Sequence, residues 1–247
     1  MTSLPGAAPP LSGPEASPSG PRVCALVPAF NEAARIGSTV LALRARSEIH
    51  AVVVADDGSG DSTADLARAA GADLVLSLVN GGKGAALTAA YQAARGLGDI
   101  FLLLDGDLGA SASECVKLLP LLWNREADMT IGLLPPDPDF ARSGQRGGRG
   151  LVVRLARWGI ARRTGQHFEQ PLSGQRAVRR EVLEKLGGVF APGFGVEVAL
   201  TVGALQAGFH VREVPTHFRH HVTGGDWRSL RHRARQLWDV ARIVLRP

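Results

Sequence analysis

Two aspartates separated by one glycine directly follow five apolar residues in the stretch IFLLLDGDLGAS, residues 100–111. Each ionised carboxylate removed from water costs several kcal/mol unless it is paired, so a buried strand has no use for two of them at its tip. Asp105 and Asp107 can share one divalent cation, and their hard oxygen atoms favour Mg²⁺ or Mn²⁺. Such an ion would neutralise a diphosphate. The alternative is a hydrogen-bonded turn.

A second pair of acids ends another apolar run, AVVVADD, residues 51–57. A carboxylate at a strand end can accept a hydrogen bond from the imide N–H of a nucleobase or from a ribose hydroxyl. Asp56 and Asp57 are therefore candidates for contacts with a nucleoside. The alternative is two solvated aspartates before a helix that is capped by Asp61 or Ser62. That alternative does not explain why both acids lie on a strand.

Polar residues also end the first apolar run, in the stretch VPAFNE, residues 27–32. Pro28 stops the hydrogen-bonding ladder of a strand, and Asn31 with Glu32 can make polar contacts at the rim of a sheet. The alternative for Asn31 and Glu32 is an ordinary helix cap.

A lysine among glycines, Lys83 in NGGKGAAL (residues 80–87), begins a predicted helix. The backbone N–H groups and dipole of a helix start favour an anion, and the lysine adds a positive charge. The stretch lacks the GxxxxGK[ST] spacing of a phosphate-binding loop, which excludes a P-loop ATPase. The alternative is an exposed lysine in a loop.

The elements that must position these residues alternate between strands and helices. Apolar runs predict strands at 23–30, 51–57, 74–78 and 100–105, and the segments between them predict helices at 31–46, 61–71 and 84–98. This alternation predicts an α/β fold with a mostly parallel sheet covered by helices on both faces. Ligands of such sheets bind beyond the carboxyl ends of the strands, where all four motifs lie.

The second half of the chain is less regular. We expect helices at 151–163 and 195–206 and a strand at 210–215, after a Pro- and Gly-rich loop at 136–150. Glu197 lies among glycine and apolar residues of the helix at 195–206. A carboxylate there can bind sugar hydroxyls or act as the base that deprotonates an acceptor. The alternative is a glutamate on the surface of the helix.

Taken in order, the four motifs resemble the family 2 glycosyltransferases, which have the GT-A fold, and the resemblance covers residues 23 to about 135. It implies that Lys83 lies near the nucleotide or its phosphates, that Asp105 contacts the ribose or the metal, and that Asp107 binds the metal. The implied nucleotide-sugar site consists of Pro28, Ala29, Asn31, Glu32, Asp56, Asp57, Lys83, Asp105 and Gly106.

The second half resembles the glucosyl-3-phosphoglycerate synthases, which are retaining enzymes with a UDP-glucose donor, in the stretches GGRGL (147–151), QPLSGQRAV (170–178) and GFGVEVALTV (193–202). The resemblance implies an acceptor site of Gly148, Arg149, Gly150, Ser173 and Gly174. Leu151 and Val152 depart from that family, which has a polar threonine near this loop. The resemblance also implies that a histidine completes the metal shell, and among His217, His220 and His221 we favour His220.

Composition limits the remaining possibilities. The 247 residues are 45% hydrophobic, and Cys24 and Cys115 are expected to be buried thiols. The net charge of +5 is concentrated after residue 215, which argues against a nucleic-acid-binding body. Residues 1–21 are predicted to be a disordered leader. Residues 226–247 predict a basic amphipathic helix that either docks on the core or lies on an anionic membrane.

Together these features predict a GT-A domain at 22–225, with a nucleotide half at 22–135 and an acceptor half at 136–225. We expect a glycosyltransferase that uses a nucleotide-diphosphate sugar, UDP-glucose first, with Glu197, Asp107 and Lys83 as catalytic residues. The acceptor is a small phosphorylated or carboxylated molecule, or alternatively a polyprenyl phosphate.

Two other functions fit the sequence less well. One is a sugar-1-phosphate nucleotidyltransferase, which would need a Gly-rich loop at the first strand, and the other is a non-catalytic sugar-nucleotide-binding module. We expect a cytoplasmic protein, at the inner membrane face if the C-terminal helix binds lipid, and a homodimer is compatible with the sequence.

Overall fold

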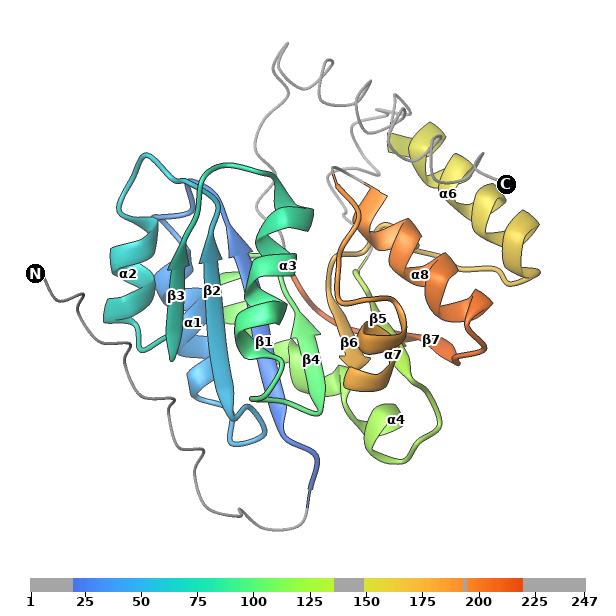
Figure 1. The fold of residues 1–247 in the computed structure, drawn as a ribbon, viewed down its shortest axis with the longest axis horizontal. Helices are drawn as coiled ribbons and strands as arrows, with labels where there is room; N and C mark the ends of the chain where they lie inside the picture. Colours follow the sequence, from blue (N-terminus) through green and yellow to red (C-terminus); the bar gives the residue numbers. More distant parts are fainter. Residues whose placement is uncertain (1–19, 136–148, 193–194, 220–247) are drawn as a thin grey trace, which may run out of the picture.

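The computed structural model of the chain describes residues 20–135, 149–192 and 195–219. Within these ranges, seven strands form one sheet in the order β3-β2-β1-β4-β6-β5-β7 (Figure 1). The strands are β1 Val23–Ala29, β2 Ala51–Asp56, β3 Leu74–Ser77, β4 Ile100–Leu103, β5 Met129–Leu133, β6 Arg176–Arg179 and β7 Val211–Pro215.

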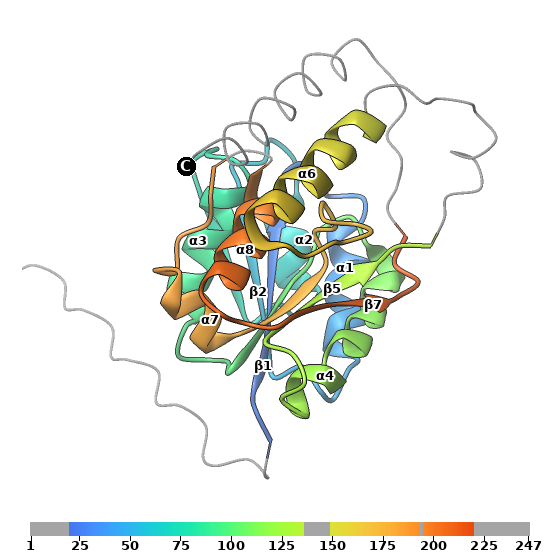
Figure 2. The same cartoon turned by 90° about the vertical axis from the view of Figure 1, so that its right-hand side faces the viewer.

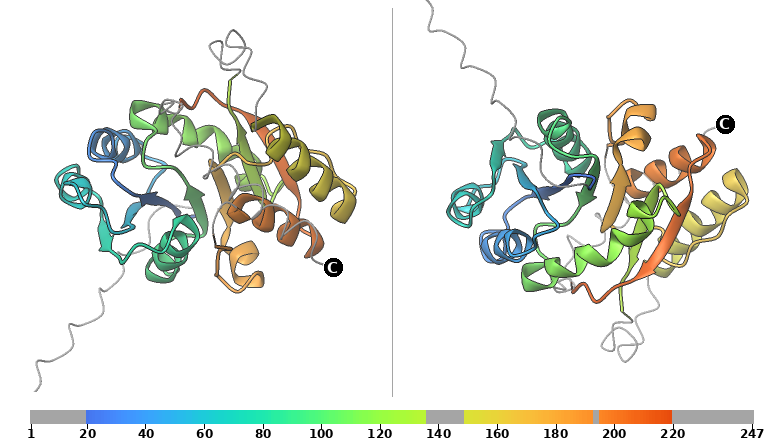
Figure 3. Two further views of the ribbon diagram at one scale, coloured as in Figure 1. Left: turned by 90° about the horizontal axis from the view of Figure 1, so that it is seen from above. Right: turned by 90° about the horizontal axis from the view of Figure 1, so that it is seen from below.

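The first four strands pair in parallel, as the alternating sequence pattern predicts. Strands β1, β2 and β4 are buried along their whole length, which explains why they are continuous apolar runs. Helices cover both faces of this half (Figure 3): α3 Lys83–Ala94 lies on one face, and α1 Ile36–Arg44 with α2 Thr63–Ala69 lies on the other. The strands and helices predicted for residues 51–105 are therefore confirmed.

In the second half of the chain, one strand of the sheet runs antiparallel to its neighbours. β6 runs antiparallel to both β4 and β5, while β7 pairs in parallel with β5. A 3₁₀ helix at Gly109–Leu118 and helix α4 Pro120–Trp123 precede β5. Helices α6 Arg149–Thr164, α7 Arg180–Lys185 and α8 Val196–Gln206 complete this half (Figure 2). The predictions at 151–163, 195–206 and 210–215 correspond to α6, α8 and β7.

Two expectations for the first-strand motif are wrong. Pro28 does not stop the ladder, because β1 stays paired with β2 through Pro28 and Ala29. The helix predicted for 31–46 begins only at Ile36, because Asn31 adopts a left-handed backbone conformation with φ 55° and the next residues form turns. Arg35 is the N-cap residue and no side-chain cap bond is present, so Asn31 and Glu32 do not cap α1. The VPAFNE motif therefore ends in a loop and not in the first turn of a helix.

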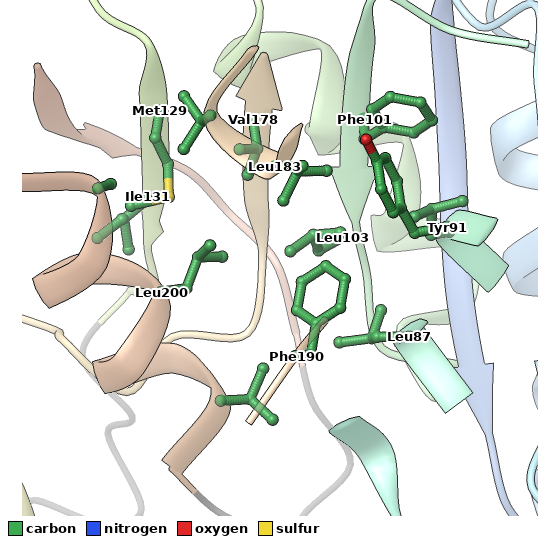
Figure 4. Packing of buried hydrophobic residues seen from close by; sticks show 14 of the residues in the cluster. Leu87, Tyr91, Phe101, Leu103, Met129, Ile131, Val178, Leu183, Phe190 and Leu200 are labelled. Carbon is green, nitrogen blue, oxygen red and sulfur yellow. The ribbon is translucent and has the colours of Figure 1, made fainter. Parts of the chain in front are cut away.

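One apolar cluster spans both halves of the sheet (Figure 4). Leu87 and Tyr91 of α3 pack with Phe101 of β4, and the cluster continues to Phe190 and to Leu200 of α8. The Tyr91 and Phe101 rings meet edge to face, with centroids 5.1 Å apart. The nucleotide and acceptor halves therefore share a core. Both cysteines are buried, as expected.

The predictions for the leader at 1–21 and for the helix at 226–247 concern residues that lie almost entirely outside the described ranges. Among the described helices, none combines the length and the apolar character needed to cross a bilayer.

Candidate active site

The ends of β1, β2 and β4 bring three of the sequence motifs to one edge of the sheet. Ala29 pairs with Asp56, and the N–H of Leu104 donates a hydrogen bond to the carbonyl oxygen of Leu26. The turn after β4 packs directly on β1, because a Cβ atom added at Gly106 would lie 3.2 Å from Cβ of Ala29.

Thr39 of α1 holds the same turn from the other side, which the sequence analysis missed. Its hydroxyl donates to the carbonyl oxygen of Gly106 and accepts from the N–H of Gly109, each at 2.8 Å. Its side chain is fully buried. This threonine and the packing of Gly106 on β1 fix the backbone that carries Asp105 and Asp107.

Lys83 joins the two halves of the site. Its ammonium nitrogen lies 2.7 Å from Oδ1 of Asp105 and 2.8 Å from Oε1 of Glu197, which belongs to α8. Burial alone would lower the pKa of Lys83, but the two carboxylates outweigh it and hold the pKa well above its usual value. The ammonium group is therefore permanently charged near neutral pH, and the alternative of an exposed loop lysine is wrong.

Glu197 is a buried residue of α8, with only 11% of its side chain exposed. The alternative of a surface glutamate is therefore wrong. A buried carboxylate must be paired, and the ion pair with Lys83 supplies the partner. Because Asp105 follows β4 and Glu197 begins α8, this pairing requires that both halves of the sheet are folded.

Asp56 and Asp57 are both buried, which excludes the alternative of solvated aspartates. The two carboxylate oxygens of Asp57 accept hydrogen bonds from the N–H groups of Gly81 and Gly82, each at 2.8 Å. The backbone N–H groups of the Gly-rich loop therefore bind an anion, as expected, and for these two groups that anion is the side chain of Asp57. Asp57 holds the loop that presents Lys83, while Asp56 accepts a hydrogen bond from the hydroxyl of Ser59.

The loop after β1 is fastened to the loop after β2. The N–H of Asn31 donates to the hydroxyl of Ser59 at 2.8 Å, and its side-chain oxygen accepts from the N–H of Gly60 at 2.9 Å. The N–H of Glu32 donates to the hydroxyl of Thr63 at 2.8 Å. The left-handed conformation of Asn31 is thus stabilised by contacts that also shape the rim of the site.

Acidic groups concentrate beside this rim. The pKa of Glu32 is raised by burial and then by the nearby negative charges of Asp107, Asp105 and Asp61, although Arg35 opposes them. A cation placed among these carboxylates would relieve the repulsion that acts on Glu32, and their hard oxygen atoms suit Mg²⁺ or Mn²⁺. No group of three His, Cys, Asp or Glu side chains within the described ranges forms a complete metal site.

Of the three histidines considered as metal ligands, only His217 lies within the described ranges. The predicted ligand His220, and His221 with it, lie outside these ranges. His217 is described and is exposed, and its Nδ1 lies 3.3 Å from Glu114 and 3.1 Å from Lys117. The assignment of His220 to the metal therefore stays a prediction.

The predicted acceptor residues are only partly brought together. A Cβ atom at Gly174 would lie 2.6 Å from Nζ of Lys83, so this position lies against the charged cluster and a side chain there would displace it. Ser173 is 5% exposed and donates its hydroxyl to the carbonyl oxygen of Gly132, so that hydroxyl is directed into the fold rather than offered to an acceptor. Gly150 faces open space at the start of α6.

The remaining two acceptor predictions cannot be placed by their side chains. Gly148 lies outside the described ranges, and Arg149 is described only as the first residue of α6. Their roles therefore stay predictions.

Two polar residues of the PLSGQR segment support the cluster and were missed by the sequence analysis. Nε2 of Gln175 donates to Oδ2 of Asp105 at 2.8 Å. Arg176 is 1% exposed and donates to the carbonyl oxygens of Ser173 and Pro171 and to the hydroxyl of Thr201, at 2.8–2.9 Å. The buried position of Arg176 could not be inferred from the sequence, because it follows from the pairing of β6 with β4.

Comparison with known proteins places this arrangement among sugar-transferring enzymes. The sequence model of glycosyl transferase family 2 matches residues 24–187, more than half of the chain. Glycosyltransferase AglJ of Haloferax volcanii is 31% identical over 217 residues, which cover 85% of this chain and 67% of that protein. The polyprenol monophosphomannose synthase of Mycolicibacterium smegmatis is 31% identical, and the match covers 82% of this chain and 79% of the synthase.

The glucosyl-3-phosphoglycerate synthase of Mycobacterium tuberculosis is 30% identical over 215 residues, which cover 76% of this chain and 62% of the synthase. The chain thus spans less than two thirds of the length of that relative. A crystal structure of this synthase with Mn²⁺, uridine diphosphate and phosphoglyceric acid superposes with a TM-score of 0.73 at 27% identity and covers 92% of this chain and 80% of that one.

These similarities confirm the predicted GT-A architecture and the predicted class of enzyme, a glycosyltransferase. The individual site residues are not tested by them, so their roles stay predictions. The matched region runs from the second residue of β1 to the second residue after α7 and contains all four motifs of the nucleotide half. The chain belongs to glycosyl transferase family 2.

Proposed function

We propose that the protein transfers glucose from UDP-glucose to a small phosphorylated or carboxylated acceptor, with Mg²⁺ or Mn²⁺ as cofactor. The observation that carries the proposal is the cluster of Lys83, Asp105 and Glu197 at the carboxyl ends of the parallel strands. This cluster joins the nucleotide half to α8 of the acceptor half. A glycosyltransferase must hold the bond between the diphosphate and the sugar of its donor at such a junction.

The donor is inferred from the nucleotide half. The synthase of Mycobacterium tuberculosis has been crystallised with Mn²⁺, UDP-glucose and phosphoglyceric acid, and that structure has a TM-score of 0.73 against this chain at 28% identity. In this chain, Asp56 and the loop after β2, which is hydrogen-bonded to Asn31, lie at the carboxyl-terminal edge of the sheet. We assign them to the nucleoside, and Ala29 and Gly106 form the floor beneath it.

Asp105 and Asp107 are the residues that would hold the divalent cation, and Glu32 adds negative charge beside them. The chemistry that such a cation supplies is positive charge against the leaving diphosphate. Lys83 contributes a second positive charge at the same edge, and its raised pKa keeps it protonated throughout the reaction.

Glu197 is positioned by Lys83 rather than by solvent, because its side chain is nearly buried. If the enzyme retains the configuration of the sugar, Glu197 binds sugar hydroxyls, whereas if it inverts the configuration, Glu197 is the base that deprotonates the acceptor. In the second role the carboxylate takes up the proton of the acceptor hydroxyl as the new glycosidic bond forms, and the ammonium group of Lys83 at 2.8 Å holds the carboxylate in place for it.

A polyprenyl phosphate is the second candidate acceptor. It is supported by the polyprenol monophosphomannose synthase, of which the chain covers a larger share, 79%, than of the phosphoglycerate synthase, 62%. Both acceptors carry a phosphate, but they differ in the oxygen that attacks the sugar, which is a phosphate oxygen in the polyprenyl phosphate and the hydroxyl oxygen in the phosphoglycerate.

A transfer assay tests this proposal. The protein is incubated with radiolabelled UDP-glucose and Mn²⁺, together with 3-phosphoglycerate or a short-chain polyprenyl phosphate, and labelled product and released UDP are measured. We expect glucose transfer to the phosphoglycerate that is abolished by EDTA and by Asp107→Ala. Transfer only to the polyprenyl phosphate would replace the acceptor, and the absence of any response to UDP-sugars, in the assay and in thermal shift, would refute the donor.

A further inference from the structure

Helix α6 carries an unusual charge distribution. Its sixteen residues, RGLVVRLARWGIARRT, contain five arginines and no acidic residue. The helix lies at the periphery of the molecule beside α8 (Figures 1 and 2). Val152, Ala156 and Ile160 are buried in the core cluster shared with α8, so the opposite side of α6 faces outward.

The outward side combines apolar and basic residues at helical spacing. Leu151 is 58% exposed and Trp158 is 49% exposed, and Arg154 and Arg162 continue the same stripe. The guanidinium group of Arg162 lies 5.7 Å from the centroid of the Trp158 ring. We call these four residues the α6 outer face.

We propose that the α6 outer face binds the surface of an anionic phospholipid bilayer. Tryptophan and leucine side chains enter the boundary between headgroups and acyl chains, while arginines pair with lipid phosphates. A nucleic acid would satisfy the arginines but would leave Leu151 and Trp158 in water. The proposed mode is peripheral, because none of the described helices is suited to span a bilayer.

Charge also argues against the C-terminal segment of this chain as the partner of the α6 outer face. Residues 226–247 contain six arginines against Asp226 and Asp239, so they repel α6 more than they neutralise it. Two basic segments in one chain are compatible with a common anionic surface. The proposal concerns where the enzyme acts, at a membrane surface, and it applies to either candidate acceptor.

The position of α6 gives this contact a consequence for the site. Gly150, in the first turn of α6, is predicted to contact the acceptor and is followed directly by Leu151 of the α6 outer face. A bilayer bound along this helix would therefore lie next to a residue that is predicted to contact the acceptor.

Co-sedimentation with vesicles tests the proposal with the full chain. We expect binding to vesicles of 70% phosphatidylcholine and 30% phosphatidylglycerol and little binding to pure phosphatidylcholine, with weaker binding at 300 mM than at 50 mM NaCl. Each arginine near such a surface contributes about a fivefold gain in affinity, so Arg154→Glu/Arg162→Glu should weaken binding by at least about 25-fold. Trp158→Ala should weaken it several-fold at both salt concentrations.

The matched control is Arg68→Glu/Arg95→Glu, which makes the same change in net charge at exposed positions on α2 and after α3. It should bind vesicles within about threefold of the wild type, and thermal melts should show that all variants are folded. Equal losses in the control and the α6 variant would overturn the proposal, as would failure of the wild type to bind anionic vesicles. A 20-base-pair DNA duplex that binds as tightly as vesicles, with no effect of Trp158→Ala on either, would show a nonspecific polyanion surface and would also overturn it.

Discussion

Removal of the Lys83 ammonium group should leave the carboxylates of Asp105 and Glu197 facing each other without the positive charge that lies between them. In Lys83→Met, the aliphatic part of the side chain is kept and only the charge and its hydrogen bonds are lost. Because Nζ lies 2.7 Å from Oδ1 of Asp105 and 2.8 Å from Oε1 of Glu197, these two oxygens are no more than about 5.5 Å apart.

The size of the effect follows from that separation. Two unit charges about 5.5 Å apart repel by about 3 kcal/mol at an effective dielectric constant of about 20. Partial exposure of Asp105, whose side chain is 27% exposed, lets water screen part of this repulsion. We therefore expect Lys83→Met to lower the free energy of unfolding by about 2 kcal/mol.

Urea unfolding followed by circular dichroism measures this loss, and the chain offers a matched control. Lys117 forms a salt bridge of the same length, 2.7 Å, with Glu114, but its side chain is 42% exposed. Lys117→Met should cost no more than about 0.5 kcal/mol, as expected for a surface pair. The double variant Lys83→Met/Glu197→Gln should recover part of the stability lost in the single variant, because the repulsion is gone.

The reasoning fails if Lys83→Met and Lys117→Met have the same free energy of unfolding. It also fails if Glu197→Gln lowers the free energy of unfolding as much in the Lys83→Met variant as it does in the wild type. The same Lys83→Met variant should also lose glucose transfer, whereas Lys117→Met should retain it. A fully active Lys83→Met enzyme would remove Lys83 from the catalytic residues.

Four further predictions concern packing and buried groups. Gly84→Ala should lower the free energy of unfolding by about 2 kcal/mol, measured in urea, because the added Cβ would lie 2.1 Å from the carbonyl oxygen of Ala191. Burial raises the pKa of both Cys24 and Cys115 to about 12, so neither thiol should react with a disulfide reagent at pH 8 until the protein is unfolded. Because unfolded thiols ionise above about pH 8.5, stability should also fall as pH rises beyond that value, and a flat profile between pH 8.5 and 10 would contradict this. Arg176→Met should cost about 3 kcal/mol in urea, because three buried acceptors lose their donor.

The nucleotide half could be predicted from the sequence because its signals are local. Apolar runs that end in aspartate define both the strands and the edge at which their ends meet, and parallel pairing then brings Asp56 and Asp105 to one edge. Chain order and handedness leave few other arrangements for such strands.

The contacts that hold the site could not be predicted, because they join residues far apart in the sequence. Lys83 and Glu197 are 114 residues apart, and Gln175 reaches Asp105 only because β6 enters the sheet antiparallel to β4. β6 is four residues long and carries two arginines, so no apolar run marks it as a buried strand. The role of Asp57 was also hidden, since a carboxylate that holds two loop amides has the same sequence signal as one that binds a ligand.

These long-range contacts explain why a glycosyltransferase site of this kind depends on the whole sheet. Asp57 fixes the loop before α3, the loop positions Lys83, and Lys83 holds Glu197 of α8 against Asp105. The carbonyl oxygen of residue 191 lies so close to Gly84 that the segment before α8 packs directly on the start of α3. Because Lys83 belongs to the donor half and Glu197 to the acceptor half, the charged cluster is complete only when both halves are folded, and loss of either contact should weaken both sugar binding and stability.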